Sequence, residues 1–309
     1  MIHVGRRLLE FILFLLLLSF ISFVLMKLAP GDAVRDVLGV EDVAVNQDVI
    51  DAQREEMGFN RPLLTQYREW LFAAIQLDFG QSFMTRRPVT EEIITRVPAT
   101  LLLTGTSVLV MLSISIPIGI LSSFKSLSVI NQFGRIFAVV GTSIPGFWLG
   151  ILLIELFSVR LGWLPSMGTG SIRHLILPSL ALGLTMAAVY VRMIRSSMTI
   201  SMEKEFVRGA RARGLSSWRV TLNHGFRHAL SPLLGYFSVT LGSLLGGTVV
   251  IEVLFSYPGL GKFAIDAIHN RDYPVIQGYM VAVALLITLF NVLNDALQVW
   301  LQPESRRRG

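Results

Sequence analysis

The sequence contains no cysteine, and only 16% of its 309 residues are charged. Without cysteine, the chain can form neither a disulfide nor a thiolate metal site. This low share of charge, with 52% hydrophobic residues and a mean hydropathy of +0.61, lies outside the usual range of soluble domains. The composition therefore predicts a membrane protein with several spans and no large additional soluble domain.

Motifs for catalysis and nucleotide binding are also missing. The segment SYPGLGKF at 256–263 lacks the first glycine of a phosphate-binding loop and has Phe263 where that loop needs serine or threonine. His224 and His228 share one helix face, but HGFRH lacks the glutamate of a hydrolytic zinc motif, and Arg227 would repel a cation. No nucleophile elbow is present. We therefore expect no enzymatic activity, no metal and no cofactor in this chain.

The chain begins with an apolar run from about residue 8 to residue 28, behind Arg6 and Arg7. A helix of this length spans the roughly 30 Å of a bilayer's hydrocarbon core. The run is too long for a signal peptide, and no clear cleavage site follows it. Residues 1–29 are therefore expected to form a retained anchor span. Residues 30–95 are expected to form a hydrophilic extracytoplasmic region with short amphipathic helices.

Five further apolar runs predict an all-α, polytopic membrane protein with six transmembrane helices in all. The runs lie at about 98–122, 137–159, 176–196, 229–254 and 276–299. We expect bends near Pro117 and Pro145, because proline removes a helical hydrogen bond. Residues 96–300 are expected to form a five-helix core, and residues 301–309 a basic tail.

Lysine and arginine are concentrated in alternate connections, which sets the orientation of the spans. With the N-terminus in the cytoplasm, the inner connections hold the arginine-rich segment 197–228 and the tail residues Arg306, Arg307 and Arg308, while the short outer connections hold few cations. We therefore expect an inner (cytoplasmic) membrane protein with both termini in the cytoplasm. The net charge of +6 is explained by these anchors, so no nucleic-acid partner is expected.

Few ionisable side chains lie inside the apolar runs, where an unpaired charge costs several kcal/mol. Glu155, Arg192 and Arg195 are candidates for a polar translocation path, with hydrogen bonding between helices or interfacial placement as the alternative. For Glu252 and Asp295 the alternative is favoured, because both lie near the ends of their runs.

The segment EFVRGARARGLSSW at 205–218 carries small and apolar residues at helical spacing, with arginines on another face. Gly214 predicts a turn between one short helix and a second helix that leads into the next span. Such an element could lie on the membrane surface, or dock into another protein through its arginines.

Several segments together resemble the permease subunits of binding-protein-dependent ABC importers, in the branch that takes up peptides and nickel. They are GARARGLSSWRVTLNHGFRHALSPLL, PGDAV after the first span, LDFGQSF, YVRMIRSSM and EVLFSYPGLGKFAIDAIHNRDYPVIQ. The wider importer signature reads Glu-Ala-Ala, three residues, then Gly. Here Arg208 and Gly209 replace the Glu and the first Ala, whereas Ala210 and Gly214 are kept. The peptide and nickel branch typically reads as this chain does, and the resemblance covers nearly the whole chain.

This resemblance implies a type I ABC importer permease fold and several partners. Two separate ATPase subunits would bind ATP and magnesium, a second related permease would complete the pore in the lipid bilayer, and an extracytoplasmic binding protein would deliver the substrate. The implied ATPase-coupling residues are Glu205, Arg208, Gly209, Ala210, Arg211, Arg213, Gly214 and Leu215. The implied outer gate, on the side of the binding protein, comprises Tyr257, Pro258, Gly259, Gly261, Arg271, Asp272 and Pro274.

The expected function is ATP-driven import of nickel, a metal chelate or short peptides by alternating access. The short outer connection GWLPSMGTGSIRHLILPS resembles nickel, metal-chelate and some oligopeptide permeases better than dipeptide permeases with long insertions there. A permease specific for di- or oligopeptides is the alternative within the branch. Two alternatives lie outside this family. One is an ion-coupled secondary transporter, against which the absence of inverted repeats counts. The other is a membrane-bound structural or assembly subunit.

Overall fold

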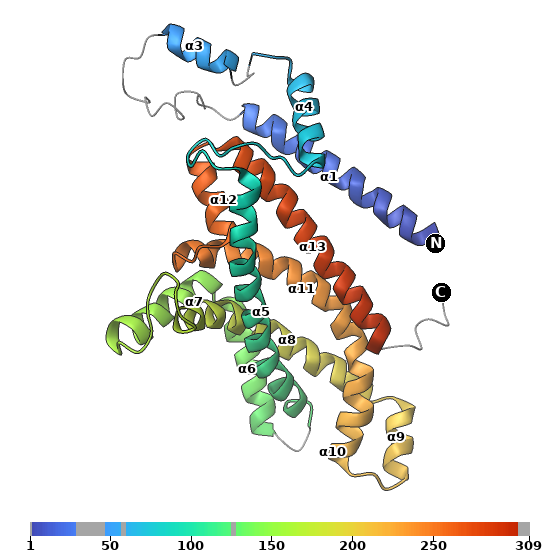
Figure 1. The fold of residues 1–309 in the computed structure, drawn as a ribbon. Coiled ribbons are helices and arrows are strands. Elements are labelled where there is room, and N and C mark those ends of the chain that lie inside the picture. Colours follow the sequence, from blue (N-terminus) through green and yellow to red (C-terminus); the bar gives the residue numbers. More distant parts are fainter. Residues whose placement is uncertain (1, 29–46, 57–59, 125–127, 302–309) are drawn as a thin grey trace. The chain divides into compact units, whose positions relative to one another are not determined.

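The computed structural model describes residues 2–28, 47–56, 60–124 and 128–301 (Figure 1). Over these residues the protein is helical, and a single bridge between Gln81 and Pro88 is the only strand-like pairing. The all-α prediction is confirmed. The PGDAV segment and the three tail arginines lie outside the described residues.

The helices follow the predicted order of apolar and amphipathic segments. They are α1 (Ile2–Leu28), α3 (Gln47–Glu56), α4 (Leu63–Ile75), α5 (Val89–Leu121), α6 (Ser128–Ser143), α7 (Gly146–Leu153), η1 (Ile154–Arg160), α8 (Arg173–Met202), α9 (Glu205–Ala212), α10 (Ser217–Arg219), η2 (Val220–Phe226), α11 (Arg227–Leu254), α12 (Leu260–His269) and α13 (Tyr273–Leu301). The chain divides into two compact units. The first unit contains Met1–Pro98 and Lys262–Leu286, and the second contains Ala99–Gly261 and Ile287–Gly309.

Within the described part of the chain, four helices are long and apolar enough to cross a membrane. They are Val89–Leu121, Arg173–Met202, Ser217–Leu254 and Tyr273–Leu301. Val129–Ser143 and Gly146–Arg160 pass the same test as a bent pair, and α1 contains the shorter apolar stretch Leu9–Val24. The protein is therefore a multi-pass membrane protein with four or five spans by length and composition, and a count of six stays a prediction.

The bent pair arises at Pro145. The two helices meet at 100°, and Pro145 caps the second helix with extended backbone angles (φ −62°, ψ 138°). Proline disfavours the helical conformation of the residue before it and lacks the N–H that would continue the first helix. The bend expected near Pro145 is confirmed, so the run 137–159 is not one straight helix. By contrast, α5 continues through Pro117 to Leu121.

The helix α5 begins at Val89, well before the apolar run predicted to start near residue 98. Its first turns are charged, and they pack against α13. A Cβ added to Gly278 of α13 would lie 2.8 Å from Val89 and 2.9 Å from Ile93. Hydropathy marks the stretch suited to hydrocarbon, not the end of the helix, so the helix extends beyond the apolar run.

The second unit is packed around α8, which contacts α6, α7 and α11. Ala187 and Ala188 of α8 are fully buried. A Cβ added to Gly141 would lie 2.5 Å from the Cβ of Ala188, and one added to Gly183 would lie 2.6 Å from the Cβ of Val110. These small residues let the helix backbones approach closely, which is how helices gain packing energy in lipid.

We expect Gly183→Ala to lower the melting temperature of the purified protein in detergent. The added Cβ would meet Val110 at 2.6 Å and the Ser107 carbonyl oxygen at 2.9 Å. Overpacking of this kind costs about 1–3 kcal/mol. The control is Gly105→Ala on α5, where an added Cβ has open space and alanine favours the helix. Equal melting temperatures for the two variants would contradict this packing.

Candidate coupling and outer-gate sites

The arginine-rich segment forms the helix, turn and second helix that its sequence predicts (Figure 1). After α9, Gly214 adopts a φ of +76°, and a continuous helix then runs from Ser217 to Leu254. The Gly214 N–H donates to the Arg211 carbonyl oxygen at 2.9 Å. Because only glycine adopts such a φ without strain, Gly214 fixes the point at which the chain reverses.

One face of α9 is pinned by apolar packing. Val207 and Ala210 of α9 pack with Val220 of η2, and all three side chains are fully buried. Met202 and Leu215 cover this cluster. Two of the expected coupling residues, Ala210 and Leu215, therefore hold α9 in place within the chain.

The remaining face of α9 is charged and exposed. Glu205, Arg208 and Arg211 lie on it, and Arg213 follows at its end. None of these arginines forms an ion pair with a carboxylate in the described part of the chain; Arg213 Nε donates only to the Gly209 carbonyl oxygen, at 3.4 Å. An added Cβ at Gly209 would meet nothing within 4 Å. This face is therefore open to another protein.

The turn at 257–261, which contains four of the expected outer-gate residues, wraps around a buried carboxylate. Glu252 is 0% exposed and accepts hydrogen bonds from the Thr100 hydroxyl at 2.6 Å and the Gly261 N–H at 2.7 Å. The Leu260 N–H donates to Thr100 Oγ1 at 2.8 Å. Glu252 and Thr100 therefore satisfy two of the free N–H groups at the start of α12, those of Gly261 and Leu260. The hydrogen bonding between helices favoured for Glu252 is confirmed.

Close packing around this carboxylate also explains the two glycines of the PGLG sequence. A Cβ added to Gly259 would lie 2.2 Å from Glu252 Cδ, and one added to Gly261 would lie 2.5 Å from Val249 Cα. Burial raises the pKa of the Tyr257 hydroxyl, and the charge of Glu252 raises it further. The Tyr257 hydroxyl therefore stays protonated at neutral pH.

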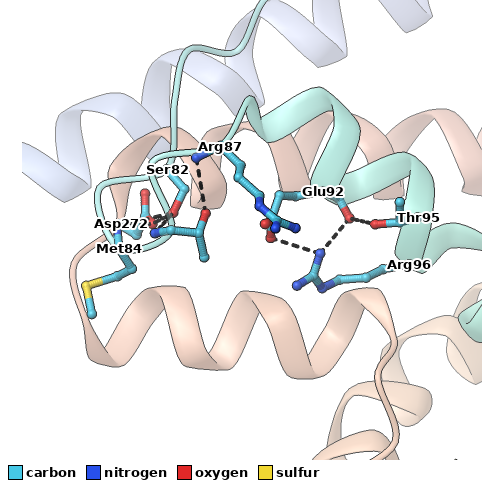
Figure 2. Close-up of polar contacts among 8 residues, drawn as sticks. Ser82, Met84, Arg87, Glu92, Thr95, Arg96 and Asp272 are labelled. Atoms are coloured by element: carbon cyan, nitrogen blue, oxygen red, sulfur yellow. Dashed lines mark hydrogen bonds and ion pairs between the residues drawn. The ribbon is translucent and has the colours of Figure 1, made fainter.

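In the first unit, Asp272 clamps a hairpin to the turn between α12 and α13 (Figure 2). Asp272 Oδ2 accepts hydrogen bonds from the Ser82 hydroxyl at 2.5 Å and from the Met84 N–H at 3.4 Å. Ser82 and Asp272 are 1% and 2% exposed. Arg271, directly before the aspartate, has a φ of +50°, which marks the sharp turn. The clamp fixes hairpin 80–89 to the segment NRDYP.

An ion pair lies close to this clamp (Figure 2). Glu92 Oε2 is 2.9 Å from Arg96 Nη1, and the glutamate is only 6% exposed. The Arg96 guanidinium also lies 4.0 Å from the centroid of the Phe263 ring. The sequence did not single out Ser82 or Thr100, because their partners Asp272 and Glu252 lie far away in the chain. Glu92 was also not singled out, although Glu92 and Arg96 have the i,i+4 spacing of a helical ion pair.

The seven expected outer-gate residues fall in both units. Tyr257, Pro258, Gly259 and Gly261 belong to the second unit, and Arg271, Asp272 and Pro274 to the first. The first of these groups contains Gly261, which donates to the buried Glu252, and the second contains the buried Asp272 itself. Their gating role stays a prediction.

The expected translocation-path residues do not form a group. Glu155 Oε1 lies 3.0 Å from Arg160 Nε, and both side chains are well exposed in the chain. Arg192 and Arg195 lie on α8, exposed and half-buried respectively. No group of three or more potential metal-binding side chains in the described residues could hold a metal ion.

These features define a class of protein: a multi-pass helical membrane protein whose arginine-bearing helix between two spans is anchored on one face and open on the other. Residues 115–307 match the family described as binding-protein-dependent transport system inner membrane component. Residues 1–104 match the N-terminal family of the same membrane component. The chain belongs to the permease family of binding-protein-dependent ABC importers.

Known relatives match over almost the full length. The glutathione transport system permease protein GsiC of Salmonella typhimurium is 39% identical over 98% of both chains, and that of Escherichia coli K12 is 38% identical over the same share. The inward-facing MetNI methionine ABC transporter gives a TM-score of 0.55 at 20% identity, covering 68% of this chain and 96% of that one. An amino acid ABC transporter gives 0.52 at 18% identity, covering 68% and 94%. The two structures support the type I importer permease fold.

We expect Thr100→Val to lower the melting temperature of the protein. The substitution removes a donor to the buried Glu252 carboxylate and the acceptor for the Leu260 N–H. Leaving buried polar groups unpaired costs about 1–3 kcal/mol each. Thr199→Val on α8 is the matched control, because the exposed Thr199 hydroxyl bonds only to its own helix, at the Arg195 carbonyl oxygen. A melting temperature for Thr100→Val as high as that of the control would argue against this cap.

Proposed function

We propose that this chain is the permease subunit of an importer for short peptide-like solutes such as glutathione, energised by a separate ATPase. Membership of the importer permease family is supported by the matches over residues 1–104 and 115–307. The proposed substrate class rests on the 39% identity, over 98% of both chains, with a glutathione transport system permease protein. Because of these relatives, we propose a peptide-like substrate in place of nickel or a metal chelate.

In this proposal α9 is the element that receives movement from the ATPase. Its arginines lie exposed and can pair with carboxylates of a partner, while bare backbone at Gly209 permits a close approach. Its buried face packs on η2, which continues directly into α11. A displacement of α9 would therefore pass into a membrane span, and alternating access follows from the repacking of the spans.

The arrangement of partners follows from the same proposal. The α9 element lies in the cytoplasm with both termini, and α12 and hairpin 80–89 lie on the outer side, where the binding protein delivers the solute. A second, related permease completes the pore. ATP and magnesium bind to the ATPase subunits, so this chain contributes no catalytic residue.

The coupling role predicts that Arg211→Glu and Gly214→Leu each reduce the ATPase that copurifies with the permease by about tenfold or more, because one reverses a pairing charge and the other straightens a turn. Arg211 is exposed on α9, and Gly214 has a φ of +76°. The control is Arg135→Glu, on the exposed surface of α6. Normal association and transport in both coupling variants would refute the role of α9.

The substrate class predicts that the importer's own binding protein takes up glutathione. Isothermal titration with glutathione, a dipeptide and Ni²⁺ measures the preference directly, and glutathione or the dipeptide should bind most tightly. A binding protein that binds only Ni²⁺ would overturn the substrate while leaving the permease assignment intact. Uptake into proteoliposomes driven by an ion gradient without ATPase would overturn the importer mechanism itself.

A further inference from the structure

Hairpin 80–89 combines a rigid base with an exposed, cationic tip. At the base, the Ser82 N–H donates to the Arg87 carbonyl oxygen at 3.0 Å, and the Val89 N–H donates to the Gly80 carbonyl oxygen at 2.9 Å. The Ser82 hydroxyl is held by Asp272. The residues from Met84 to Arg87 are all exposed. The tip therefore projects from a fixed base and carries two adjacent arginines.

The side chains of the two tip arginines, like that of Arg68 on α4, have no carboxylate partner in the described part of the chain. Three others are paired within the unit: Arg54 with Asp51, Arg61 with Glu69, and Arg96 with Glu92. Arg86 and Arg87 are exposed instead, and the Arg87 backbone N–H donates only to Thr85 Oγ1, at 3.4 Å.

Arg86 also occupies a position at which the backbone favours glycine. Its φ is +58°, in the left-handed region that disfavours a residue with a Cβ. Nothing in the described chain pairs with the Arg86 side chain or otherwise accounts for an arginine at this strained position. An arginine that is kept at a conformational cost, with no ion-pair partner among the described residues, points to a partner outside the chain.

The distance of the tip from the apolar run of α5 favours a soluble partner over lipid. The apolar run of α5 starts near residue 98, and the helical residues Val89–Val97 place the hairpin about 13 Å beyond it at 1.5 Å per residue. The headgroup region adds only about 5–8 Å to each leaflet. Glu91, exposed in the first turn of α5, would also repel an anionic headgroup.

We propose that the tip of hairpin 80–89 is a contact surface for carboxylates on the importer's extracytoplasmic binding protein, with Arg86 and Arg87 as the pairing cations. The inference rests on the proposed function, because that function places the hairpin on the outer side and supplies the partner. The buried Ser82 and Asp272 pair keeps the tip in one conformation, so little ordering cost opposes docking.

The test uses the assembled importer in nanodiscs and its own binding protein, with and without glutathione. Arg87→Glu should weaken binding by about tenfold, mainly through a slower association rate, and should reduce the dependence of binding on salt. Arg68→Glu, which reverses the charge of an exposed arginine on α4, is the matched control and should bind as the wild type does. Arg86→Gly should also weaken binding, yet raise the melting temperature by relieving the strained φ.

Three outcomes separate the possibilities. Unchanged binding in Arg87→Glu and Arg86→Gly would overturn this surface and leave the proposed function standing. If the variants lose binding of the binding protein in phosphatidylglycerol nanodiscs but keep it in phosphatidylcholine nanodiscs, the arginines bind lipid headgroups, and the inference is overturned. A wild-type importer that does not bind the binding protein at all would count against the proposed function, and with it against this surface.

Discussion

The structure depends on the absence of water in the bilayer core, where every backbone N–H and C=O must find a partner within the protein. This constraint makes helices the only form available to the apolar runs, and it requires polar side chains to find hydrogen-bond partners within the protein. The same constraint explains Glu252. A carboxylate that is 0% exposed is tolerated because the Thr100 hydroxyl and the Gly261 N–H both donate to it. The glycines of the following turn then provide the space that the carboxylate needs.

Close helix packing in the second unit follows from small residues. Hydrocarbon offers apolar side chains no gain from leaving lipid, so helices hold together through contact between backbones and through short polar links. Gly141 against Ala188 and Gly183 against Val110 are contacts of the first kind. Thr106 Oγ1, 2.7 Å from Ser179 Oγ, is a contact of the second kind. Contacts of this kind allow helices to repack, which the proposed alternating access requires.

The α9 element and the hairpin follow one structural plan. Each is fixed by a buried anchor, the Val207, Ala210 and Val220 cluster in one case and the Ser82 and Asp272 pair in the other. Each presents exposed arginines that have no carboxylate partner among the described residues. An anchored base transmits movement and holds a surface ready for a partner, whereas an exposed cation can form an ion pair when the partner arrives. The plan suits a protein whose function depends on other subunits.

The sequence by itself determined the helical class, the membrane location and the helix, turn and helix around Gly214, because hydropathy, helical spacing and a glycine at a turn are local signals. It also singled out the segments PGLG and NRDYP, through the resemblance to the permease family, and the structure shows both as turns. It marked the apolar run within α5 but not the first residue of that helix, because the helix begins before its apolar stretch. Only the tertiary structure decided what those turns enclose: Ser82 meets Asp272 across 190 residues, and Thr100 meets Glu252 across 152. Such pairs leave no periodic trace in the sequence, because they form only once the chain has folded and distant segments share one buried space.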